Sequence, residues 1–94
     1  MDKTIKQVTV EQLVNDKGNK VMNHFIIHTP EGKYLQSYDS IISFTDLEGN
    51  ITLGVDWDYS NTTRKYRNQW LGMTSKELKE KIENGTIKID NNLL

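Results

Sequence analysis

The sequence has 94 residues, of which 35% are hydrophobic and 27% charged, with a formal net charge of −1 and no cysteine. This length and composition predict a single domain, residues 1–94, with one hydrophobic core, and the lack of cysteine excludes disulfides, thiol catalysis and zinc sites built on thiolates. No apolar run follows the N-terminus and none approaches about 18 residues, so we expect no signal peptide, no membrane span and a cytoplasmic location.

Residues 9–18 predict a first, short helix. Thr9 and Gln12 have the spacing of a capping box, and Val8 and Leu13 have the spacing of a hydrophobic staple around it. Gly18 would end the helix in a left-handed conformation.

Four β-strands are predicted next, at residues 20–29, 33–38, 41–45 and 51–55. Each run is short, rich in β-branched or aromatic residues, and bounded by turn residues. Pro30 and Gly32 occupy the second and fourth positions of a type I turn between the first two runs. Short connections of this kind predict an antiparallel meander.

The hydrophobic period then changes to that of a helix over residues 61–71. Asp58 or Ser60 is placed to cap this helix, and Gly72 is placed to end it. Thr74 and Glu77 form the capping box of a further helix, which residue 85 ends.

Alternation over residues 87–89 predicts a last short strand at the sheet edge. The predicted fold is therefore α+β, a four- to five-stranded antiparallel sheet with two or three short helices packed on one face.

Two residue patterns suggest a metal site, and neither is sufficient. His24 and His28 face the same side of a predicted strand as two half-exposed side chains, but they lie about 13 Å apart and cannot share a metal ion. Asp56 and Asp58 lack the further carboxylates and the glycine of a calcium loop. No nucleophile elbow and no phosphate-binding loop is present. We expect no cofactor, no metal and no enzymatic activity.

Residues 56–71 form the most informative segment. Tyr66 and Trp70 lie on one face of the predicted helix, which we expect to pack on the sheet. Arg64, Arg67 and Asn68 lie on another face, which packing does not explain. Exposed arginines can bind phosphates or carboxylates through two parallel hydrogen bonds. We therefore predict a partner-binding face that also includes Lys65.

The charges are separated along the chain. Residues 34–63 contain five acidic residues and no basic residue, a net charge of −5, whereas residues 64–88 contain seven basic and three acidic residues, a net charge of +4. Such separation permits steering toward a charged partner, although the two regions can also neutralise each other within the fold. The acidic candidates for partner binding are Asp39, Asp46, Glu48 and Asp56.

Two segments resemble a known family. YLQSYDSII at residues 34–42 and WDYSNTTRKYRNQWLG at residues 57–72 are similar to the patterns F-x-S-Y-x-S-x-I and W-D-Y-S-x-T-T-x-K-Y-x-x-x-F-L of small proteins from phages and mobile elements of Gram-positive bacteria. Leu35 and Trp70 replace phenylalanine and keep an apolar side chain. The family is a domain of unknown function, so the resemblance implies no catalytic residues.

The resemblance implies a function by context. Small phage proteins commonly bind and inhibit host proteins, and we expect this chain to be such an inhibitor, of a CRISPR effector or another defence nuclease. The alternative is a nucleic-acid-binding accessory protein that uses the basic helix at residues 61–71 with aromatic stacking.

Overall fold

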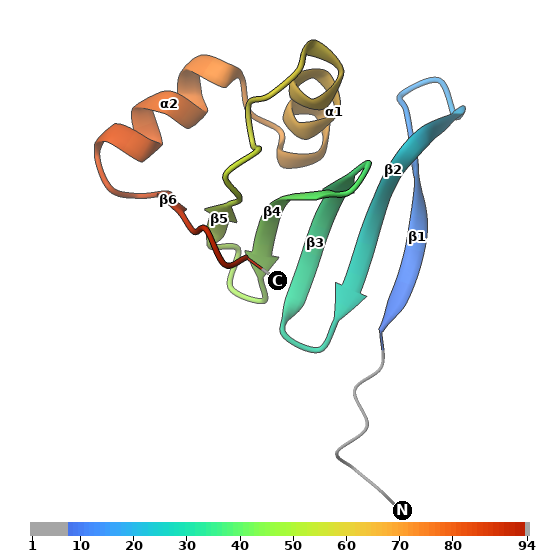
Figure 1. Cartoon of the computed structure of the whole chain (residues 1–94), viewed down its shortest axis with the longest axis horizontal. Coiled ribbons are helices and arrows are strands. Elements are labelled where there is room, and N and C mark those ends of the chain that lie inside the picture. The colour runs from blue at the N-terminus through green and yellow to red at the C-terminus, as the bar shows by residue number, and fades with distance from the viewer. Residues whose placement is uncertain (1–7, 94) are drawn as a thin grey trace, which may run out of the picture.

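The fold is a six-stranded sheet with two helices on one face, as the computed structural model describes it for residues 8–93 (Figure 1). The elements, in chain order, are β1 (Thr9–Val14), β2 (Lys20–Thr29), β3 (Gly32–Ser37), β4 (Ser40–Asp46), β5 (Ile51–Leu53), α1 (Asn61–Leu71), α2 (Ser75–Glu83) and β6 (Lys88–Ile89). The strands lie in the order in which they occur in the chain. The predicted α+β class and meander are confirmed.

Only the last strand pair departs from the antiparallel pattern. β6 pairs parallel to β5, with Thr52 opposite Lys88 and Leu53 opposite Ile89. The connection between the two strands contains both helices, because a parallel pair cannot be joined by a tight turn. In the chain, both helices therefore come between β5 and β6, which are neighbours in the sheet.

The predicted first helix is wrong, because residues 9–14 form strand β1. β1 pairs antiparallel with β2, with Thr9 opposite His28 and Gln12 opposite Phe25. β-Branched residues prefer strands, since their χ1 angle is restricted in a helix. Gly18, which was to end the helix, has φ +81° and lies in the turn between the two strands. The sixth strand of the sheet is thus β1.

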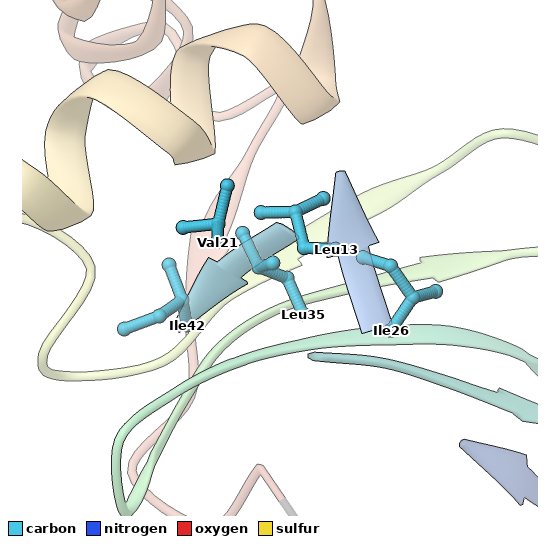
Figure 2. Packing of buried hydrophobic residues seen from close by; sticks show 5 residues of the cluster. All are labelled: Leu13, Val21, Ile26, Leu35 and Ile42. Carbon is cyan, nitrogen blue, oxygen red and sulfur yellow. The ribbon is translucent and has the colours of Figure 1, made fainter. Parts of the chain in front are cut away.

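The core lies between the sheet and the helices and has two parts. The first part consists of Leu13, Val21, Ile26, Leu35 and Ile42, which Figure 2 shows gathered on the side of the sheet where α1 lies. Trp57, Tyr66 and Trp70 pack against it. The second part consists of Leu53, Leu78 and Ile87, and Trp57 also packs there. Trp57 therefore joins the two halves of the core.

Two glycines permit close approaches between strands. A Cβ atom on Gly32, which has φ +153°, would collide with the backbone carbonyl oxygen of Thr45. A Cβ atom on Gly54 would collide with the carbonyl oxygen of Ile41. Both positions join β4 to a neighbouring segment, so β4 packs at backbone contact distance on both sides.

The opposite face of the sheet carries a row of apolar side chains. Pairing places Val10 of β1 opposite Ile27 of β2, then Tyr34 of β3, then Phe44 of β4. The rings of Tyr34 and Phe44 are in contact, with their centroids 4.6 Å apart. No helix of the described part covers this face, and Val10 is 63% exposed. We call these four residues the outer row.

The described residues include no helix that is both long and apolar enough to span a membrane.

Candidate functional site

Helix α1 begins and ends where the sequence predicted. The Ser60 hydroxyl accepts a hydrogen bond from the backbone N–H of Thr63, so Ser60, and not Asp58, is the N-cap. Gly72 ends the helix with φ 69°. Asp58 has another role, since its carboxylate accepts hydrogen bonds from Arg64 and Arg67.

The predicted basic face is not free, because Arg67 is fully buried. The Arg67 side chain is 0% exposed. Its guanidinium donates to the backbone oxygen of Trp57, to Asp58 Oδ1 (3.2 Å) and to Ser75 Oγ (2.7 Å). It also donates to the side-chain oxygen of Asn68 (2.9 Å) and lies 4.9 Å from the Trp57 ring centre. The expectation that Arg67 faces a partner is therefore wrong.

Burial also acts on the charge of Arg67. Desolvation lowers the pKa of Arg67 below the ordinary arginine value, because a buried site disfavours the charged form. The hydrogen bond and the charge of Asp58 oppose this shift. The role of Arg67 is structural: it joins the loop before α1, helix α1 itself and the start of α2.

The other three members of the predicted basic face differ in exposure. The Arg64 side chain is 36% exposed and donates to Asp58 Oδ1 (2.9 Å) and to the side-chain oxygen of Asn61 (2.7 Å). Asn68 is half-buried; its side-chain oxygen accepts a hydrogen bond from Arg67, and its side-chain nitrogen donates one to Ser75. Lys65 is exposed, with its ammonium 5.3 Å from the Tyr66 ring centre. Because Arg67 is buried, the alternative hypothesis of nucleic-acid binding through α1 loses one of its main basic side chains.

A second buried polar network joins the sheet to α1. His24 is 1% exposed, so the prediction that it is half-exposed is wrong. His24 Nδ1 lies 2.8 Å from the Met22 carbonyl oxygen and therefore carries the proton, which makes Nε2 the acceptor for the Ser37 hydroxyl (3.0 Å). Ser37 in turn contacts the Thr63 hydroxyl (3.1 Å). Each ring nitrogen of His24 thus has a hydrogen-bond partner.

The network is closed to solvent and cannot meet a substrate. Ser37 and Thr63 are 0% and 1% exposed. The His24 ring makes edge contacts with Tyr38 and Tyr66, with centroids 5.7 and 5.2 Å apart. A serine next to a histidine therefore serves here as a polar contact between layers.

The predicted acidic residues lie in two places. Asp39 and Asp56 line one hollow of about 220 Å³ together with Asp90, and Asp56 accepts a hydrogen bond from Ser40 (2.7 Å). Asp46 is the last residue of β4, and Glu48 lies in the turn that follows, at the other end of the strand. Because β4 has seven residues, the two acidic groups lie about 20 Å apart. They flank the outer row and do not form one patch.

The turn at Asp46 is held by its carboxylate. Asp46 Oδ1 accepts from the backbone N–H groups of Glu48 and Asn50, both at 2.9 Å. These hydrogen bonds, above all the one from Asn50, lower the pKa of Asp46. Among residues 8–93, no group of three or more His, Cys, Asp or Glu side chains is arranged to hold a metal ion.

The family profile described as "Family of unknown function (DUF8033)" matches residues 8–87, which is most of the chain. The chain belongs to this family. No curated protein and no solved structure matches the chain.

Within this family member, the two sequence motifs meet at the interface between sheet and helix. Leu35, Ser37 and Ile42 of the first motif are buried in or beside the core. Ser60 and Thr63 of the second motif continue the hydrogen-bond chain from Ser37. The buried residues of the two motifs therefore hold helix α1 against the sheet.

The outer row is the feature that sequence reasoning missed. Alternation along each strand indicates which residues share a face, but the row appears only when the register of neighbouring strands is known. Tyr34 and Phe44 lie within predicted strands, and the contact between their rings forms the β4 end of the outer row.

Proposed function

We propose that this protein is a non-enzymatic accessory protein of a phage or mobile element that acts in the bacterial cytoplasm by binding and inhibiting a host protein. The observation that supports this best is the outer row, an apolar strip on the helix-free face of the sheet. Apolar and aromatic side chains inside a polar rim are typical of protein-binding surfaces.

The acidic residues at both ends of β4 define the kind of partner. Asp39 and Glu48 are exposed just beyond the two ends of β4, one on each side of the Phe44 end of the strip. Carboxylates in the rim of an apolar surface favour a partner whose own rim is basic, and they speed association by steering. Proteins that handle nucleic acids carry such basic rims. A defence nuclease, such as a CRISPR effector, fits this description.

The test separates the function from the surface. The protein should inhibit DNA cleavage by purified CRISPR effectors from Gram-positive hosts, and it should restore infection by a targeted phage in an immune strain. Phe44→Thr, which keeps a strand-forming residue but removes the ring, should weaken inhibition at least about tenfold if the ring is a hot spot. Tyr59→Thr is the matched control, because Tyr59 is a 50% exposed aromatic outside the strip.

Each outcome decides one part of the proposal. If neither inhibition nor restored infection occurs with any effector type, the proposed inhibition of a CRISPR effector is wrong. If inhibition occurs and folded Phe44→Thr retains it, the function stands and the assigned surface is wrong.

A further inference from the structure

The two edges of the sheet are protected differently. The β6 edge has only two residues, Lys88 and Ile89, and Asp90 follows directly. Short length and charge are the usual means of preventing an edge strand from pairing with another chain. The β6 edge is therefore closed to further strands.

The β1 edge is less protected, because the strand is longer and its register is regular from Thr9 to Gln12. β1 has six residues, contains no proline or lysine, and pairs only with β2 among residues 8–93 (Figure 1). Its one charged residue, Glu11, is engaged with His28 at 2.7 Å. An edge of this kind presents backbone N–H and C=O groups that can accept another strand.

The outer row ends at this open edge. Val10 is 63% exposed, and the neighbouring Val8 is 55% exposed. Val10 is in line with Ile27, Tyr34 and Phe44, so the apolar strip stops where β1 stops. A strand added at this edge would bury the exposed side of Val10.

We propose that two copies of this chain associate through their β1 strands, antiparallel, to form one continuous sheet. The complementary edge is another β1 strand, because antiparallel pairing of identical strands about a two-fold axis gives both copies the same contacts. This inference concerns self-association and does not rest on the proposed host target.

The register follows from the residues of β1. An axis at Glu11 would place the two Glu11 carboxylates opposite each other, and like charges in opposite positions are destabilising. An axis at Gln12 would use the irregular part of the strand, where the register shifts between Gln12 and Val14. An axis at Val10 avoids both problems and places Val10 opposite Val10, with Thr9 opposite Glu11.

This register makes the two outer rows continuous. Four strands from each copy contribute one apolar side chain, and neighbouring strands lie about 4.8 Å apart, so the joined row would extend roughly 34 Å. The association thus removes the open edge and doubles the length of the apolar strip.

Sedimentation equilibrium of the full chain tests the proposal first. The expected mass at high concentration is twice 10.9 kDa. Val10→Lys should weaken association by about tenfold or more, since it places two ammonium groups opposite each other and removes the valine contact. Val55→Lys is the matched control, because Val55 is a similarly exposed valine (57%) outside the strand. Circular dichroism checks that both variants are folded.

Cross-linking provides an independent test of the register. The chain has no cysteine, so a single introduced thiol reports on its own position. Val10→Cys should form a covalent dimer with a short bis-maleimide reagent, and Val55→Cys should not. A mass of one chain at all concentrations would overturn the proposal. So would a dimer that folded Val10→Lys leaves intact, or equal cross-linking by the two cysteine variants.

Discussion

Replacing Arg67 by alanine should destabilise the protein strongly. Four hydrogen-bond partners and the stacking on Trp57 would be lost together, and the backbone oxygen of Trp57 would lose the hydrogen bond from Arg67. Removing one partner of a buried charge network costs about 3–5 kcal/mol. Asp58 would retain Arg64 and is 30% exposed, so water can solvate it. We therefore expect the lower value, a loss of about 3 kcal/mol in the free energy of unfolding.

This loss is large for a domain of this size. A change of 1 kcal/mol shifts the melting temperature of such a domain by about 4–8 °C, so Arg67→Ala should melt roughly 12–24 °C lower. Arg64→Ala is the control, because Arg64 binds the same carboxylate but is 36% exposed, and exposed ion pairs contribute about 1 kcal/mol or less.

Urea denaturation followed by circular dichroism measures both variants. Arg67→Lys keeps the charge but lacks the planar fork that reaches several acceptors, so it should fall between the wild type and alanine. A loss below about 1 kcal/mol for Arg67→Ala would refute the structural role. Partner binding abolished at unchanged stability would also refute it, and would restore Arg67 as a contact residue.

Three further predictions concern other contacts. Ser37→Ala should lower the free energy of unfolding by about 1–3 kcal/mol, because it breaks the buried hydrogen-bond chain. Ser43 is equally buried but its hydroxyl has no partner among residues 8–93, so Ser43→Ala should be neutral or stabilising in the same urea denaturation. Hydrogen bonds from Thr74 lower the pKa of the Glu77 carboxyl, and hydrogen bonds chiefly from Asn50 lower that of Asp46. The stability that these bonds contribute is present above the unfolded-state pKa of each carboxyl and is lost as the pH falls through its folded-state pKa, so the urea midpoint should fall on acidification. A midpoint that does not change with pH would contradict this. Gly54→Ala should cost roughly 1–3 kcal/mol or more by clashing with β4, measured as a fall in melting temperature.

Local signals predicted most of the fold. Helix α1 lies at the predicted residues 61–71, and the predicted capping box of Thr74 and Glu77 is present. These features are fixed by side chains three or four residues apart, which the sequence shows directly. The same kind of signal failed at residues 9–14, because Thr9 and Gln12 fit both a capping box and a paired strand. Pairing with β2 decided between the two conformations, and the sequence does not show that pairing.

The candidate site was predicted less well, for a related reason. Helical spacing correctly separated Arg67 from the aromatic face of α1, but spacing does not show what covers a given side of a helix. The Trp57 backbone and Ser75 of α2 cover Arg67, and both reach it through tertiary folding. His24 was expected to be half-exposed for the same reason, and α1 covers it through Tyr66.

The parallel pairing of β6 with β5 has a consequence for the order of folding. The hairpins from β1 to β4 consist of contacts between neighbouring segments, so they can form as soon as those segments have been synthesised. The contact between Leu53 and Ile89 must wait for both helices, because they lie between the two strands in the chain. A nascent chain that stalls within α2 would therefore present a finished meander while Leu53 still lacks the cover that Ile87 gives it in the complete fold, and apolar surface exposed in this way favours aggregation.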